Sequence, residues 1–224
     1  MVISGAIFDM DGTLVDSLMI WDVLWSKLGE KYRNDPAFQV SETVDKNVRT
    51  MTLEAAMEYV HQEYNMAKSG KELLDVANDI IAKFYATQVQ LKPGVLELLD
   101  CLLNKQIPMC IASATDIRLI KIAMAHCGLE KYFPKIFSCA DIGKGKDCPD
   151  IYLAAQEYLG SEIEETWVFE DSAVAVCTAH GIGMKTVGIF DRYNYGQDVL
   201  QQTADIYIAE YQTLEDAQRL IFGK

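Results

Sequence analysis

The ten residues FDMDGTLVDS run from Phe8 to Ser17 and follow the short apolar run of residues 2–8. An apolar run of this length is typical of a buried β-strand. Because residues two apart on extended backbone point to the same side, we expect Asp9 and Asp11 to project together at the carboxyl end of this strand. The glycine that follows lets the backbone turn away. Two carboxylates this close repel each other, and Mg²⁺ bound by their oxygens is the simplest compensation.

Such a pair of acids suits phosphoryl chemistry, because with Mg²⁺ present one carboxylate can attack phosphorus while the other moves a proton. Two other interpretations are an acidic surface turn and the start of an EF-hand loop. An EF-hand needs glutamate at the twelfth position counted from Asp9, where this chain has Ile20. It also needs a helix in front of the loop, where this chain has strand-forming residues.

Composition narrows the class of protein. The chain has 224 residues, half of them hydrophobic, which suits one large domain or a core with a smaller domain. Its formal net charge of −13 argues against a general nucleic-acid or anionic-membrane binder, but not against a small phosphorylated substrate. The six cysteines lack paired zinc-type spacing, and no apolar run approaches ~18 residues. We therefore expect a cytoplasmic monomer or weak dimer without nucleic-acid or membrane partners.

Residues 17–90 differ from the rest of the chain. Apolar residues recur there at helical spacing in three stretches, around Trp25, Met57 and Ile81, and no strand pattern is visible. The segment is several helices long, which is too much for an ordinary crossover. It is predicted to be a helical domain inserted after the first strand, and residues 1–16 and 91–224 are predicted to form the other domain.

After Gly94 the pattern alternates between helices and strands. This alternation predicts an α/β fold, a doubly wound parallel sheet with helices on both faces. Ligands of such sheets bind beyond the carboxyl ends of the strands. The expected strands are 107–112, 135–139, 166–169, 185–190 and 206–209, and the expected helices are 95–103, 116–127, 150–158, 173–180 and 214–222.

Further candidate residues fall at the ends of these strands. Ser113, followed by the backbone of Ala114 near a helix start, suits a phosphate oxygen, although a helix cap is the plainer interpretation. A lysine, Lys144 or Lys146, could offset charge near a phosphate, although most lysines are solvated. The acidic pair at 170–171 could complete a magnesium site, although an acid there could also cap the next helix.

Taken together, these segments resemble four motifs of the haloacid dehalogenase superfamily, in the order that family has them. Residues 9–13 resemble its Asp-x-Asp-Gly-Thr motif, and residues 146–150 resemble Lys-Pro-x-Pro-Asp except for Asp147. The second alignment selects Lys146 over Lys144. The resemblance implies a Rossmann-like core with a helical cap, Asp9 as nucleophile, Asp11 as proton donor and acceptor, and phosphoryl contacts from Ser113, Ala114 and Lys146. It also implies a Mg²⁺ site formed by Asp9, Asp11, Glu170 and Asp171.

The function that this resemblance implies is hydrolysis of a small sugar or polyol phosphate through an aspartyl-phosphate. The alternative is a phosphosugar mutase similar to beta-phosphoglucomutase, whose cap carries a histidine where this chain has Trp21. Two further hypotheses are a non-catalytic protein that binds a phosphorylated metabolite and a dehalogenase. In the cap, Trp21 could stack on a sugar or simply pack, and Arg49 could meet a second anionic group or lie solvated.

Overall fold

The main sheet consists of six parallel strands. The structure is a computed structural model and describes residues 2–49 and 51–223. Strand β1 lies in the middle and pairs with β4 on one side and β6 on the other. The direction of strand order reverses at β1, which is the switch point of a doubly wound fold. The spatial order is β5 (Ile136–Ser138), β4 (Met109–Ser113), β1 (Gly5–Phe8), β6 (Thr166–Glu170), β7 (Lys185–Ile189) and β8 (Ile206–Ile208).

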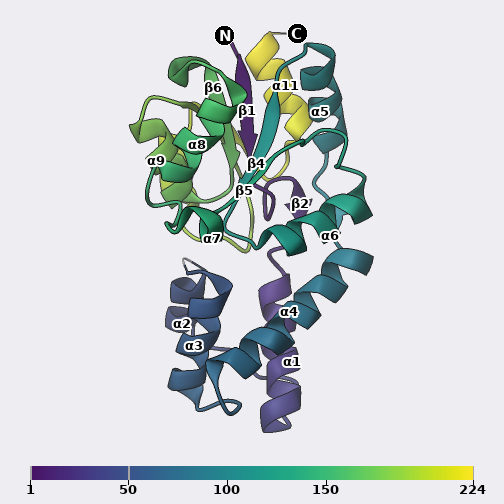
Figure 1. Cartoon of the computed structure of the whole chain (residues 1–224), viewed down its shortest axis with the longest axis vertical. Helices are drawn as coiled ribbons and strands as arrows, with labels where there is room; N and C mark the ends of the chain where they lie inside the picture. The colour runs from purple at the N-terminus through teal and green to yellow at the C-terminus, as the bar shows by residue number, and fades with distance from the viewer. Residues whose placement is uncertain (1, 50, 224) are drawn as a thin grey trace.

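Helices cover both faces of this sheet, as the alternating sequence pattern predicts (Figure 1). One face packs against α5, α6 and α11, and the other against α8 and α9. A further helix, α10, packs beside α9 and β8. The bounds are α5 Val95–Asn104, α6 Ile117–Cys127, α7 Cys139–Ile142, α8 Asp150–Leu159, α9 Ala173–Gly181, α10 Gln197–Thr203 and α11 Leu214–Phe222, with a 3₁₀ turn at Ile163–Glu165.

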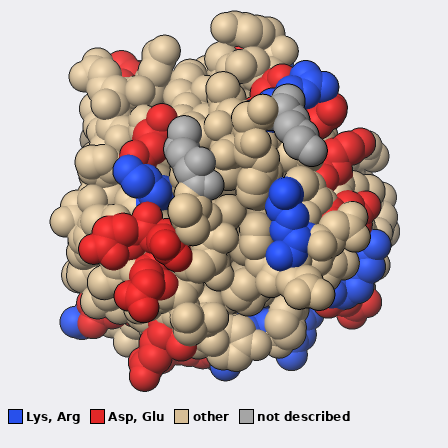
Figure 2. Space-filling model, turned by 90° about the horizontal axis from the view of Figure 1, so that it is seen from above, with Lys and Arg blue, Asp and Glu red and all other residues tan. Residues whose placement is uncertain are grey.

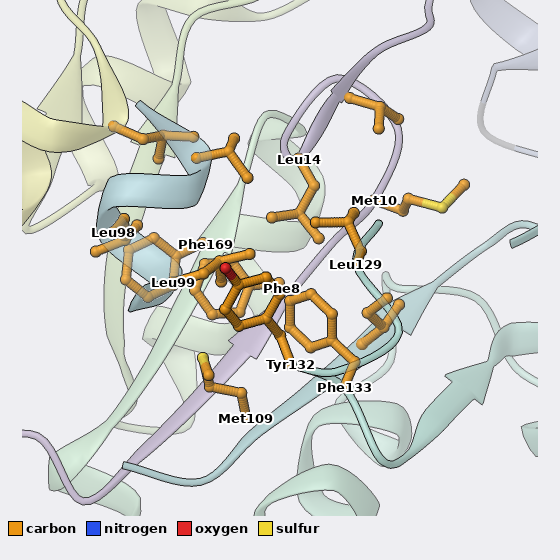
Figure 3. Close-up of a cluster of buried hydrophobic side chains, with 14 of the residues drawn as sticks. Phe8, Met10, Leu14, Leu98, Leu99, Met109, Leu129, Tyr132, Phe133 and Phe169 are labelled. Carbon is orange, nitrogen blue, oxygen red and sulfur yellow. The ribbon is translucent and has the colours of Figure 1, made fainter. Parts of the chain in front are cut away.

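Alternation along the strands divides the core between the two faces. Phe8 and Phe169, paired in register on β1 and β6, stack with ring centroids 4.3 Å apart on the face covered by α5 and α6 (Figure 3). Ile7 and Val168, their neighbours in sequence, point to the opposite face and pack under α8 and α9. All four side chains are fully buried. Because both faces of these strands are buried, their sequences are continuous apolar runs.

Between β1 and β4, residues 17–89 contain four helices, α1 (Ile20–Arg33), α2 (Glu42–Val48), α3 (Leu53–Tyr64) and α4 (Gly70–Thr87). They form a cluster of buried residues of their own around Trp25, Met57 and Leu73 and lie at one end of the molecule (Figure 1). The C-terminal part of α4 also packs against α6 of the sheet-containing part. We call α1–α4 the cap helices. The domain boundaries at residues 16/17 and 90/91 stay a prediction.

A two-stranded antiparallel pair joins the cap helices to the rest of the chain. β2 (Val15–Asp16) and β3 (Gln90–Leu91) pair Val15 with Leu91, so the chain enters and leaves the cap at one place. The sequence analysis missed this pair because each strand has only two residues. It also missed α2, α7 and α10, because α7 is a single turn and α2 and α10 are short and mostly polar. The first strand begins at Gly5, three residues later than expected, and the other expected strands and helices are confirmed to within about two residues at each end.

The surface agrees with the acidic composition. Figure 2 shows the end of the molecule at which both termini lie, where acidic side chains gather on one part and basic ones are scattered. This face carries no broad basic area of the kind that binds polyanions. Among the helices of the described residues, none is both long and apolar enough to span a membrane.

Candidate active site

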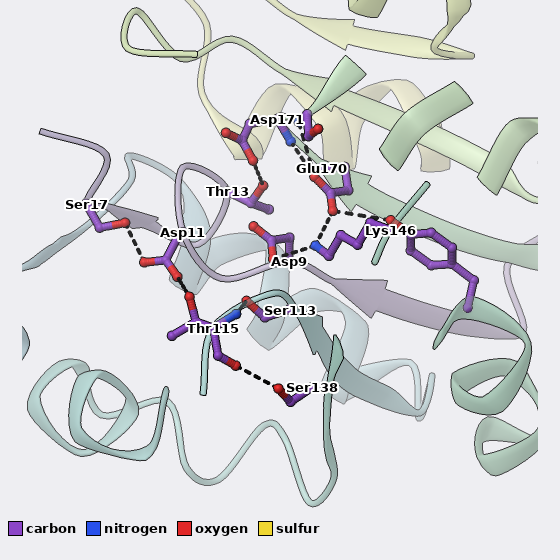
Figure 4. A network of polar contacts seen from close by, with 12 residues as sticks. Asp9, Asp11, Thr13, Ser17, Ser113, Thr115, Ser138, Lys146, Glu170 and Asp171 are labelled. Atoms are coloured by element: carbon purple, nitrogen blue, oxygen red, sulfur yellow. Dashed lines mark hydrogen bonds and ion pairs between the residues drawn. The ribbon is translucent and has the colours of Figure 1, made fainter. Parts of the chain in front are cut away.

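The predicted site residues lie at the carboxyl ends of three parallel strands, at one edge of the sheet. Asp9 directly follows β1, Ser113 ends β4, and Glu170 ends β6 with Asp171 next to it. Because the strands are parallel and adjacent, their carboxyl ends meet, and the four side chains converge there (Figure 4). The four side chains are nearly fully buried.

The carboxylates of Asp9, Glu170 and Asp171 form one group, with an oxygen from each within 4.8 Å of the others. Burial raises the pKa of Asp171 well above its usual value, and Glu170 and Asp9 raise it further. Burial likewise raises the pKa of Glu170 to about 7, even though Lys146 opposes the shift. Buried carboxylates this close are stable together only when a cation compensates them.

Lys146 supplies part of that compensation. Its Nζ lies 2.6 Å from Oδ1 of Asp9 and also contacts Oε1 of Glu170. Burial lowers the pKa of Lys146, but the two carboxylates outweigh this effect and hold the pKa well above its ordinary value. Lys144, by contrast, pairs with Asp150 at 2.7 Å on the surface. The structure thus places Lys146, and not Lys144, among the acids.

One lysine cannot balance three carboxylates, so this group fits a divalent cation. The donors are carboxylate oxygens, which are the ligands that Mg²⁺ prefers. Asp9, Glu170 and Asp171 could hold such an ion. The carboxylate of Asp11 lies outside this group, so the predicted place of Asp11 among the metal ligands is not supported by its side chain.

Asp11 lies beside the acid group and is held by three hydroxyl groups. Ser17 donates to Oδ1 at 2.7 Å, Tyr85 donates to the same oxygen at 2.5 Å, and Thr115 donates to Oδ2 at 2.8 Å. Burial raises the pKa of Asp11, Asp9 raises it further, and the three hydrogen bonds lower it in part. The net shift of the Asp11 pKa is upward. The sequence analysis did not find Tyr85, which lies on α4, or Thr115.

Neither Ser113 nor Asp171 caps a helix, whereas Oε2 of Glu170 accepts from the backbone N–H groups of Asp171 and Ser172 at 3.1 Å, just before α9. Helix α6 is capped by Asp116, whose side chain accepts from the backbone of Arg118. Ser113 is buried, and its Oγ accepts from the backbone N–H of Thr115 at 3.2 Å. Ser172 occupies the N-cap position of α9 without a side-chain capping bond. Ala114 lies exposed directly after β4, where its backbone is accessible.

Asp171 has two polar partners outside the acid group, and both fix its carboxylate. Thr13 donates to Oδ1 at 3.2 Å, and Nδ2 of Asn194 donates to Oδ2 at 2.8 Å and to the backbone oxygen of Asp171 at 3.2 Å. Asn194 lies between β7 and α10, far from every motif recognised in the sequence. No local pattern marks such a residue.

The two predicted cap residues lie together. The guanidinium of Arg49 is 5.8 Å from the ring of Trp21, and its Nε lies 2.7 Å from Oδ2 of Asp45. Nη1 of Arg49 is buried without a hydrogen-bond partner among the described residues. Trp21 also packs against Trp25, with ring centroids 5.5 Å apart. A contact of Trp21 or Arg49 with substrate stays a prediction.

Comparison with known proteins agrees with this geometry. Residues 6–189 match the family described as haloacid dehalogenase-like hydrolase. The chain belongs to this family. The resemblance found from the four motifs is therefore confirmed, and so are the Rossmann-like α/β fold and the prediction of an enzyme of this family.

Proteins similar to this chain extend over most of its length. A phosphorylated carbohydrates phosphatase of Thermotoga maritima is 24% identical and aligns over 89% of this chain and 91% of its own length. Hexitol phosphatase A of Escherichia coli is 25% identical, over 83% of this chain and 82% of its own. The structure of CbbY from Rhodobacter sphaeroides with xylulose-(1,5)bisphosphate superposes with a TM-score of 0.78 at 17% identity, covering 92% and 93% of the two chains.

Proposed function

We propose that this chain is a Mg²⁺-dependent phosphomonoesterase that hydrolyses a small sugar or polyol phosphate through an aspartyl-phosphate. The observation that carries this proposal is the group of Asp9, Lys146, Glu170 and Asp171 at the switch point of the sheet, with Asp11 beside it. The relatives named for phosphorylated carbohydrates and hexitols, and the phosphosugar bound by CbbY, support the substrate class.

In the first step, a carboxylate oxygen of Asp9 attacks phosphorus, and the bond from phosphorus to the leaving alcohol breaks. Asp11 gives its proton to the leaving oxygen, so the alcohol departs neutral. Lys146 and Ser113, with the backbone of Ala114, hold the phosphoryl oxygens. Asp9, Glu170 and Asp171 would hold the cation. The chemistry that Mg²⁺ supplies when bound is neutralisation of charge on those oxygens.

In the second step, the aspartyl-phosphate on Asp9 is hydrolysed. Asp11, now ionised, takes a proton from a water molecule, whose oxygen attacks phosphorus and releases inorganic phosphate. Asp9 is thereby restored as a carboxylate and Asp11 as an acid. Burial of the site removes competing water, so positioning and charge neutralisation supply most of the acceleration.

The test is phosphate release from a panel of phosphorylated sugars, polyols and nucleotides with Mg²⁺, with Asp9→Asn as control. Hexose-phosphate interconversion is followed in the same samples. We expect release that disappears in Asp9→Asn. Full activity of Asp9→Asn would refute the mechanism. Interconversion with little phosphate release would favour the mutase activity over hydrolysis. The sequence argues against a mutase, because Trp21 stands where the cap of those mutases carries a histidine.

A further inference from the structure

The loop of residues 190–196, between β7 and α10, contacts three separate parts of the molecule with side chains only a few positions apart. Asp191 pairs with Lys92, which follows β3 at the exit from the cap, with Oδ2 and Nζ 2.8 Å apart. Asn194 holds the carboxylate of Asp171. Tyr195, the next residue, donates its hydroxyl hydrogen to Oδ2 of Asp45 on α2, at 2.9 Å.

The contact between Asn194 and Asp171 fixes a proposed metal ligand. Both carboxylate oxygens of Asp171 accept a hydrogen bond, one from Thr13 and the other from Asn194. The side chain of Asp171 is buried, so these donors are not replaced freely by water. The amide oxygen of Asn194 accepts from the backbone N–H of Tyr195 at 2.9 Å, which ties the orientation of the amide to the next residue.

The contact between Tyr195 and Asp45 joins the loop to the cap helices. Besides the bond from Tyr195, Asp45 accepts one from Nε1 of Trp25 at 3.1 Å and pairs with Arg49. The ring of Tyr195 lies 5.1 Å from Nζ of Lys46 and 5.8 Å from the guanidinium carbon of Arg49, so cations of α2 and its C-terminal end pack against its face. Movement of α2 away from the sheet would break the contacts of Tyr195 with Asp45, Lys46 and Arg49 together.

The start of the loop is anchored independently. Lys92 and Asp191 are 12% and 2% exposed, and Nζ of Lys92 also donates to the backbone oxygen of Phe190 at 3.0 Å. A buried ion pair of this kind resists rearrangement, because separating the partners leaves a buried charge uncompensated. Displacement at Tyr195 is therefore transmitted to its neighbour Asn194 rather than absorbed at the other end of the loop.

We propose that the 190–196 loop couples docking of the cap helices to metal binding, with Asn194 as a positioning residue for Asp171 and Tyr195 as the contact to the cap. The proposal rests on the proposed function in that it takes Asp171 as a metal ligand. Coupling of this kind is reciprocal: if docking tightens Mg²⁺ binding, Mg²⁺ favours docking by the same factor. The cap would then be closed most firmly when the site is loaded.

The experiment uses Mg²⁺ alone as the probe, without substrate. Titration calorimetry measures the Kd for Mg²⁺ in the wild type, Asn194→Ala and Tyr195→Phe, with Tyr193→Phe as the matched control from the same loop. Within the described residues, the Tyr193 hydroxyl makes no hydrogen bond. We expect the Kd to rise about tenfold in Asn194→Ala, as for other residues that orient metal ligands, and about threefold in Tyr195→Phe. The Kd of Tyr193→Phe should equal that of the wild type.

Hydrogen exchange provides a second measurement that does not depend on turnover. Mg²⁺ should slow exchange of the α2 amides in the wild type and in Tyr193→Phe, but not in Tyr195→Phe. Tyr195 is 37% exposed, and the phenylalanine variant loses only a hydroxyl, so it should fold even if Asn194→Ala does not. Equal protection of α2 in Tyr195→Phe and wild type, or a Tyr195→Phe Kd equal to that of the wild type, would overturn the coupling.

Failure of the coupling and failure of the proposed function give different results. A wild-type protein that binds Mg²⁺ and protects α2, but releases no phosphate from any substrate, would refute the phosphatase and retain the coupling. If the wild-type protein binds no Mg²⁺ at millimolar concentration, Asp171 is not a metal ligand and the coupling is refuted.

Discussion

The hydroxyl of Tyr85, on cap helix α4, donates a hydrogen bond to Oδ1 of Asp11, which follows the central strand of the sheet, across a separation of 74 residues. Tyr85 is buried and Asp11 is half-buried. Burial and the neighbouring Asp11 carboxylate raise the pKa of Tyr85 well above its usual value, so Tyr85 remains a donor. The proposed proton donor is thus oriented in part by the cap.

Replacing Tyr85 with phenylalanine should lower kcat for phosphate release about tenfold, because losing a hydrogen bond that orients Asp11 costs up to about 1.5 kcal/mol. The Kd for Mg²⁺ should stay within about twofold, because the Asp11 carboxylate lies outside the acid group. Steady-state kinetics and calorimetry measure the two quantities. Tyr132→Phe is the control, since it removes a similar bond to Asp100 far from the site. Wild-type kcat in Tyr85→Phe would contradict the role of Tyr85.

Gly12→Ala should abolish most activity. Gly12 has φ of +77°, and a Cβ there would overlap Oδ2 of Asp171 and lie 2.7 Å from its Cγ. Displacement of about 1 Å at a reacting site can cost about 100-fold in rate, and we expect a loss of that size. The matched control is Gly128→Ala, with φ of +69° and open space at the Cβ. It should lose about 1–2 kcal/mol of stability but keep its activity. Equal activity losses in the two variants would show that backbone strain alone is responsible.

Lys146→Ala should lower kcat about 100-fold or more, as expected when a charged donor to the reacting group is removed. It also leaves Asp9 and Glu170 without their cationic partner, so the melting temperature in the absence of Mg²⁺ should change as well. Lys144→Ala is the comparison, because Lys144 lies two residues earlier and pairs only at the surface. Phosphate-release assays would contradict the assignment if Lys144→Ala were the more damaging change.

Asp205→Asn should destabilise the protein in a pH-dependent way. Burial raises the pKa of Asp205, but hydrogen bonds from Lys185 and from the backbone and hydroxyl of Thr186 outweigh it, so the net shift is downward. A lowered pKa means that the stabilisation is present above about pH 4, the unfolded value, and is lost as the pH falls through the folded value.

Denaturant unfolding at pH 7 should give a deficit of about 1 kcal/mol for Asp205→Asn. The deficit should shrink as the pH falls below about 4. Glu157→Gln, a change at an exposed position, serves as the control. A deficit that stayed constant down to acid pH would mean that the charge of Asp205 is not the cause.

The sequence predicted the sheet and the residues at its edge well, because both depend on local pattern. Burial on both faces makes β1 and β6 apolar runs, and a polar residue at the end of such a run must lie at the carboxyl edge. Asp9, Ser113, Glu170 and Asp171 were found in this way. The choice between Lys144 and Lys146 needed the family resemblance, since both lie in one loop.

The remaining contacts could not be predicted, because they depend on tertiary structure. Tyr85 is one of many residues on the buried side of α4, and Asn194 lies in a loop of ordinary polar composition. The expectation that Asp9 and Asp11 act side by side came from extended backbone, yet the chain already turns at Gly12, and the two carboxylates have different partners.

The central position of β1 also affects how the protein is made. Gly5–Phe8 is synthesised before both of its sheet partners, β4 and, much later, β6, which begins at Thr166. At about 5–20 residues per second, roughly 10–30 s pass between synthesis of β1 and that of β6. Throughout that time an apolar strand has at least one open edge and can pair with another nascent chain. Slower translation would lengthen this exposure and should lower the yield of folded protein.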